Sequence, residues 1–138
     1  RDRLRSRGLG DVYKRQGVRL SLEVNAESKP SWTRARNAAK RLVTDQETWD
    51  KAMRDFAAKN LTGLANNWLS QDEESARDPE TAPITEEEFA QRILLTEVSV
   101  SPGGRFTAYY NDDDMFWGHA VEVSGSLKKG ITYANLAG

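Results

Sequence analysis

The sequence predicts an α+β fold, in which an antiparallel meander sheet of four to five strands carries a long amphipathic helix and shorter helices on one face. Three observations support this. Apolar residues recur with a helical period through much of the first two-thirds of the 138 residues. Polar and apolar residues alternate in short segments of the last third, as in strands. Three short turn segments join those strands in succession, which is typical of an antiparallel meander.

The first sixteen residues are separate from this domain. Asp11 to Gln16 has the sequence that one reading frame of a common sequencing-transposon end encodes, so we interpret residues 1–16 as a non-native, disordered tail. A basic arm for nucleic acid is the alternative interpretation. This segment has six basic and two acidic residues, and the whole chain has a net charge of −1, so residues 17–138 have a net charge of −5.

Residues 17–138 have the size of a single domain with one core. Their acidity argues against nucleic acid as a partner, because phosphate binding depends on clustered positive charge. The chain has no cysteine, which excludes disulfides and thiolate metal sites and is compatible with a reducing compartment. No apolar run approaches the roughly 18 residues of a membrane helix. We therefore expect a cytoplasmic protein with no nucleic-acid or membrane partner.

The first elements of the domain are a strand and a helix. Val18 to Val24 alternates strictly, which predicts a half-buried strand that ends before Pro30. Ser31 is the expected cap of a helix. The apolar positions of that helix recur at near-helical spacing: Trp32, Ala35, Ala39, Leu42 and Val43.

A second, longer helix is expected from a capping box at Thr44 and Glu47, and its pattern continues to about Leu69. Gly63 interrupts this helix at a cost of roughly 1 kcal/mol relative to alanine, which suggests close packing or a kink. The apolar stripe predicts contact with the sheet and comprises Trp49, Ala52, Met53, Phe56, Ala57, Leu61, Leu64, Ala65 and Trp68.

Residues 70–83 are acidic and aperiodic, which predicts a surface connector. Thr85 and Glu88 form a second capping box, which predicts a helix of about two turns. Four strands then follow, at Leu94 to Val100, Arg105 to Asn111, Met115 to Ser124 and Ile131 to Leu136. In the first of these, the alternation places Leu94, Thr96, Val98 and Val100 on one face and Leu95, Glu97 and Ser99 on the other.

The turn before the third of these strands contains Asn111, Asp112, Asp113 and Asp114, which predict a hairpin connection. Together with the following Met-Phe-Trp-Gly-His, these residues resemble a signature of domain of unknown function 2262, an uncharacterised and mostly bacterial family. Further similarities lie at Thr85 to Ala90 and at Ala134 to Gly138, and the resemblance covers the chain from about Val18 onward. It implies a fold and assigns no activity.

The hairpin is also the candidate site. Aromatic side chains beside charge are typical of protein interfaces, so we expect a small acidic module that binds a protein partner of basic character, as immunity proteins do. We expect Asp112 to Asp114 to be an exposed acidic recognition turn that is framed by aromatic side chains. The candidate binding residues are Tyr109, Asp112, Asp113, Asp114, Trp117 and His119.

A metal-dependent or acid–base hydrolase is the alternative function, with the Asp112 to Asp114 turn, His119 and Glu122 as its residues. The alternation of side chains along a strand argues against this hydrolase function, because it places His119 and Glu122 on opposite faces of one strand. No second histidine completes a two-histidine zinc site, and the acidic turn lacks the spacing of an EF-hand. We therefore assign no catalytic residue, metal or cofactor, and the position of His119 relative to the turn decides between the two functions.

Overall fold

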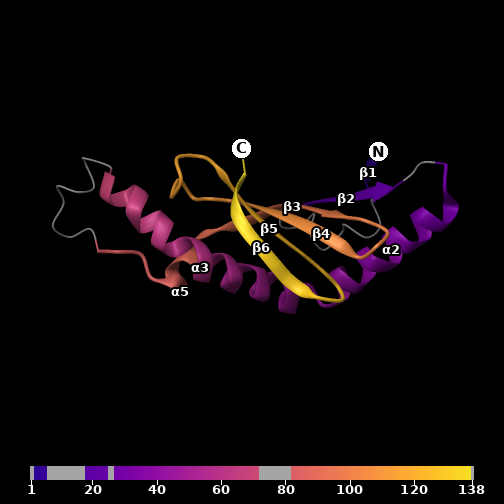
Figure 1. Cartoon of the computed structure of the whole chain (residues 1–138), viewed down its shortest axis with the longest axis horizontal. Helices are drawn as coiled ribbons and strands as arrows, with labels where there is room; N and C mark the ends of the chain where they lie inside the picture. Colours follow the sequence, from indigo (N-terminus) through magenta and orange to yellow (C-terminus); the bar gives the residue numbers. More distant parts are fainter. Residues whose placement is uncertain (1, 6–17, 25–26, 72–81, 138) are drawn as a thin grey trace.

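The computed structural model describes residues 2–5, 18–24, 27–71 and 82–137. Within these residues, three helices lie against one six-stranded sheet, so the α+β class is confirmed (Figure 1). The helices are α2 (Lys29–Thr44), α3 (Gln46–Gln71) and α5 (Glu86–Arg92). The strands, in their order across the sheet, are β1 (Asp2–Arg5), β2 (Arg19–Val24), β3 (Leu94–Val100), β4 (Arg105–Asn111), β5 (Ala120–Ser126) and β6 (Gly130–Ala137).

The sheet is mixed and mostly antiparallel. The meander prediction is confirmed for β3 to β6, in which each strand is antiparallel to the next. The fully antiparallel sheet is wrong at one junction, because β2 runs parallel to β3, with Arg19 opposite Glu97. The three helices lie between these two strands in the chain, and a long crossover of this kind lets the second strand return in the same direction.

The strand count also differs from the expected four or five. Asp2–Arg5 forms strand β1, which pairs antiparallel with β2, so the expectation of a disordered tail is wrong for these four residues. Residue 1 and residues 6–16 lie outside the described residues. That residues 1–16 are a non-native segment preceding a single domain at 17–138 stays a prediction.

All three helices lie on the same side of the sheet (Figure 1). Helix α2 packs against β2 and β3, α3 packs against β5 and β6, and α5 packs beside α3. The core between these layers includes the fully buried aromatic side chains of Phe89, Phe106, Tyr110 and Phe116. The prediction of helices on one face of the sheet is therefore confirmed.

Side-chain caps mark the starts of α2 and α5. Helix α2 begins after Ser28, whose Oγ accepts a 3.2 Å hydrogen bond from the backbone N–H of Ser31, so the expected cap at Ser31 is three residues late. Thr44 is the last residue of α2 and does not cap α3. The capping box at Thr85 is confirmed, because Thr85 Oγ1 accepts from the N–H of Glu88 at 3.1 Å and Glu88 Oε1 accepts from the N–H of Thr85 at 3.4 Å.

The buried surface of α3 is displaced from the predicted stripe. Ala52 is exposed, whereas Ala58 and Thr62 are buried on the flank where α5 packs. Gly63 is exposed and a Cβ there would meet no atom within 4 Å, so the expected close packing is not found. The stripe residues that are buried are Met53, Ala57, Leu61 and Ala65.

Strand β3 contains a bulge that the sequence pattern does not reveal. The pairing register with β4 shifts between Leu95 and Glu97, which moves Leu95 to the core face together with Val98. Leu94 is 56% exposed. The predicted faces are therefore wrong at the start of this strand, because one extra residue reverses the alternation.

Candidate functional site

The connection between β4 and β5 is a wide turn rather than a tight hairpin. Strand β5 begins at Ala120, so the predicted strand start at Met115 is wrong and residues 112–119 form the turn. The backbone is left-handed at Asp113 (φ 50°), Asp114 (φ 59°), Trp117 (φ 57°) and Gly118 (φ 93°). Residues other than glycine rarely adopt this left-handed backbone conformation, because the Cβ atom clashes with the backbone. Hydrogen bonds or packing elsewhere in the turn must therefore stabilise it.

Asp112 holds the turn from inside. Its side chain is buried, with 3% exposure. Oδ2 accepts hydrogen bonds from the backbone N–H groups of Phe116 and Gly118, both at 2.9 Å, and Oδ1 accepts from the N–H of Asp114 at 3.2 Å. The expectation that all three carboxylates are exposed is therefore wrong for Asp112, because unpaired N–H groups of the turn surround this carboxylate.

The other two carboxylates face solvent. Asp113 Oδ2 accepts a 2.8 Å bond from Arg92 Nε, and the backbone carbonyl of Asp113 accepts from Arg92 Nη2 at 3.1 Å. This pair ties the turn to the end of α5, although its exposure limits its contribution to stability. Asp114 is exposed, and its carboxylate has no hydrogen-bond partner within the part of the chain that the structure describes.

An aromatic cluster lies beside the turn. Trp117 is 62% exposed, and its ring lies 4.7 Å from the ring of Trp68 on α3. Trp68 also makes edge contacts with Phe116 at 5.5 Å and with the half-buried ring of His119 at 5.7 Å. We call Trp68, Asp114, Trp117 and His119 the tip patch.

Trp117 and His119 both contact Trp68, whereas Tyr109 lies apart from them. Tyr109 alternates with the core residues Ala108 and Tyr110, so its side chain is on the sheet face opposite the helices. Trp117, in contrast, packs on α3. The apolar stripe of α3 predicted Trp68 only as a core residue, and no sequence signal connects it with a turn almost 50 residues later.

The structure separates two residues of the hydrolase alternative, His119 and Glu122. Both oxygens of Asp112 already accept backbone hydrogen bonds. Within residues 2–5, 18–24, 27–71 and 82–137, no three histidine, cysteine, aspartate or glutamate side chains are arranged to hold a metal ion. Glu122 lies on β5 opposite Tyr109, on the open face of the sheet, whereas His119 packs on Trp68.

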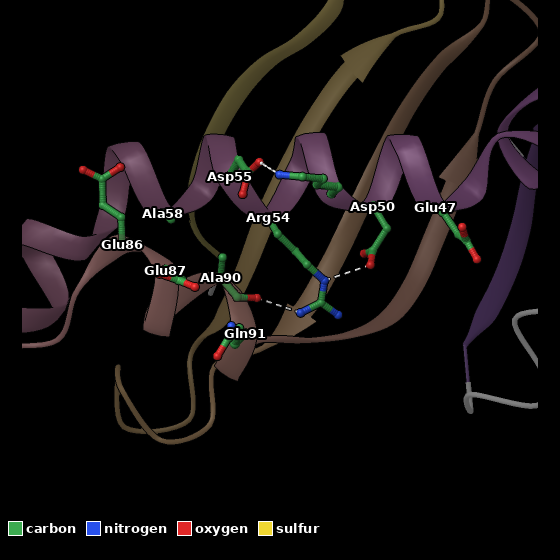
Figure 2. Close-up of a pocket in the computed structure, with 10 residues that line it drawn as sticks. Glu47, Asp50, Arg54, Asp55, Ala58, Glu86, Glu87, Ala90 and Gln91 are labelled. Carbon is green, nitrogen blue, oxygen red and sulfur yellow. Dashed lines mark hydrogen bonds and ion pairs between the residues drawn. The ribbon is translucent and has the colours of Figure 1, made fainter.

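A second surface feature is an acidic groove of about 650 Å³ between α3 and α5 (Figure 2). Five carboxylates and two cations line it, and both cations are paired internally. Lys51 binds Asp55 at 2.7 Å, and this hydrogen bond and the charge of Asp55 raise the pKa of the Lys51 ammonium group. The acidic side chains without an ion pair among the described residues are Glu47, Glu86 and Glu87.

Arg54 crosses the groove and connects its two walls (Figure 2). Its Nε donates to Asp50 Oδ2 at 2.8 Å, and its Nη1 donates to the backbone carbonyls of Ala90, at 2.8 Å, and Ile93. These carbonyls lie at the C-terminal end of α5, where intrahelical donors are lacking. Arg54 therefore has a structural role, and its charge is not available to balance the remaining carboxylates.

Comparison with known proteins gives a family and no activity. The family model described as an uncharacterised protein conserved in bacteria (DUF2262) matches residues 10–136. No match was found among curated proteins or among solved structures. In the described parts of the chain, no helix combines the length and the apolar character that crossing a membrane requires. Because the family model matches nearly the whole sequence, the chain belongs to the bacterial family known as domain of unknown function 2262.

Proposed function

We propose that this domain is a protein-binding module and that the tip patch is its contact surface. One observation carries the proposal: Trp117 is 62% exposed and is held in a left-handed backbone conformation beside a second tryptophan. Tryptophan is among the residues that most often dominate binding energy at protein interfaces.

The conformation and the exposure of Trp117 both cost free energy in the unbound protein. A left-handed conformation at a residue other than glycine costs roughly 1–2 kcal/mol, and an exposed indole leaves apolar surface in water. The fold alone requires neither feature at a turn. The buried carboxylate of Asp112 fixes the turn before any partner arrives, and such preorganisation reduces the entropy lost on binding.

The charge of the surface supports a basic partner. Asp114 is exposed in the same turn as Trp117, and the groove between α3 and α5 has three more carboxylates than cations. Residues 17–138 have a net charge of −5. A small acidic module that neutralises a basic bacterial protein in the cytoplasm, in the manner of an immunity protein, fits this surface, because complementary charge accelerates encounter and selects partners.

The test begins with capture of partners from a bacterial lysate on the immobilised wild-type chain, followed by affinity measurements on each purified candidate. Trp117→Ala should weaken binding at least tenfold, as expected for a central aromatic anchor. Tyr133→Ala is the matched control, because Tyr133 is 42% exposed and lies on β6. Equal affinities for the two variants would refute the tip patch as the contact surface.

The charge component is tested separately with Asp114→Asn. This exposed substitution should slow association and flatten its dependence on salt, while the dissociation rate changes little. A metal role for the turn would give a different result, in which calcium or zinc raises the Tm of the wild type but not of Asp114→Asn. That result would favour the hydrolase alternative over the protein-binding module.

A further inference from the structure

The two edges of the sheet differ in their protection against pairing with other strands. Strand β1 has three charged residues among its four, whereas β6 has neither a charged residue nor a proline in its eight. Each of the other five strands has at least one charged residue. Natural proteins usually guard an exposed edge with charge, proline or a covering element, so β6 lacks the usual chemical protection.

The backbone groups that face outward from β6 can be assigned from one side-chain bond. The N–H of Leu136 donates to Asn135 Oδ1 at 2.8 Å, so it does not point toward β5. Residues of an antiparallel strand alternate between bonding one neighbour and the other, and the paired registers Val121 with Leu136 and Val123 with Ala134 place both β6 residues in the outward set. Ala134 therefore directs its N–H and C=O away from the sheet.

The neighbouring flank of α3 also has an unexplained apolar side chain. Phe56 is half-buried but does not belong to the core cluster. It lies about 160° around the helix from Ala58, which lines the groove against α5. Since α5 leads directly into β3 at the centre of the sheet, the flank with Phe56 faces the β6 side.

We propose that β6 pairs antiparallel with β6 of a second copy of the chain, which extends the sheet across a two-fold axis. The neutral strand favours this occupant, because a charged residue near the axis would face its own symmetry copy, and β6 has no charged residue at any position. An axis perpendicular to the sheet keeps both helix layers on one side and brings the flanks with Phe56 toward each other. This dimer goes beyond the proposed function and does not depend on it.

The test is the mass of the full chain in solution, measured by sedimentation and by light scattering. The wild type should have twice the mass of one chain. Ala134→Pro removes an outward N–H without removing a β5–β6 hydrogen bond, so it should raise the dimer dissociation constant roughly 30-fold through the loss of two hydrogen bonds per dimer.

A second variant covers the case in which the proline disturbs folding. Asn135→Lys adds the charge that natural edge strands use, at an exposed position, and should also weaken the dimer. Thr107→Lys on the interior strand β4 adds the same charge and should leave the mass unchanged. A monomeric wild type would overturn the proposal, as would a dimer that persists in Asn135→Lys. A dimer lost equally in Thr107→Lys would also overturn it.

Discussion

The phenolic oxygen of Tyr110 donates a 2.6 Å hydrogen bond to Oδ1 of Asp50, which joins the centre of the sheet to α3. Oδ2 of the same carboxylate accepts from Arg54, whose guanidinium carbon lies 5.3 Å from the centre of the Tyr110 ring. Arg54 also binds the carbonyls at the end of α5. Three side chains thus connect β4, α3 and α5 at one point.

Arg54→Met should lower the free energy of unfolding by about 2–3 kcal/mol. The substitution retains most of the apolar stem but leaves Oδ2 of Asp50 and two backbone carbonyls without their donor. Chemical denaturation monitored by circular dichroism measures the loss. Lys51→Met is the control, because the Lys51–Asp55 pair is exposed on the same helix and should contribute far less to stability. Similar losses in both variants would contradict a specific role for Arg54.

Asp112→Asn should destabilise the protein by about 2 kcal/mol and loosen the β4–β5 turn. The asparagine amide keeps one acceptor oxygen, but its NH₂ group replaces the second oxygen. That NH₂ group is a donor and would face backbone N–H groups, which are also donors. Amide hydrogen exchange should accelerate at Phe116 and Gly118, and denaturation gives the free energy. Asp114→Asn, at an exposed position, should change neither quantity. Unchanged exchange in Asp112→Asn would mean that the turn holds its conformation by other means.

Trp68→Ala should cost about 3 kcal/mol, because the side chain packs against Phe116, Trp117 and His119. Phe56→Ala should cost about 1 kcal/mol or less within one chain, since Phe56 lies outside the core cluster. Both should be measured in the Ala134→Pro background, which separates folding from association. Equal costs would show that the original stripe, with both residues in the core, describes the packing better.

Replacement of Gly125 and of Gly63 by alanine should change the stability of the protein in opposite directions. A Cβ at Gly125 would lie 2.1 Å from the carbonyl oxygen of Gly130, so Gly125→Ala forces backbone apart at the β5–β6 bulge and should cost about 3 kcal/mol. Gly63→Ala meets no atom within 4 Å in a helix interior and should stabilise by roughly 0.5–1 kcal/mol. Thermal unfolding of the two variants measures both, and a destabilised Gly63→Ala would reveal a contact that the isolated chain does not show.

A chain that begins at Gly17 should retain the fold and lose at most a few degrees of Tm. Residues 2–5 form a short edge strand, and removing it exposes β2 without disturbing β3 to β6. Calorimetry compares this chain with the full sequence. Loss of the cooperative transition would show that residues 1–16 belong to the domain and would contradict their non-native origin.

Local chemistry explains what the sequence could predict. Alternation located β3 and β4 at their observed ends, and the Thr85 capping box located the start of α5. The parallel position of β2 depends on pairing between distant segments, which no local pattern contains. The bulge at Leu95 changes the facing of a strand without changing its composition.

The candidate site was predicted only in part, for a similar reason. The concentration of aspartates and aromatics identified the turn, and Trp117 is exposed as expected for an interface. Asp112 is instead buried, because a carboxylate among unpaired N–H groups is more stable inside the turn than in solvent. The contribution of Trp68 requires α3 to pass beside the turn, and Tyr109 is excluded by the pleat of β4.

The parallel pairing of β2 with β3 also determines when the protein can fold during synthesis. Ser99 Oγ donates to Glu23 Oε1 across 76 positions of sequence, so β2 and the two long helices leave the ribosome before any strand of the meander exists to cover them. Closing so long a loop is slow, whereas β3 to β6 require only neighbouring contacts. The apolar surfaces of β2 and of the two long helices therefore lack their sheet partners until the last third of the chain emerges.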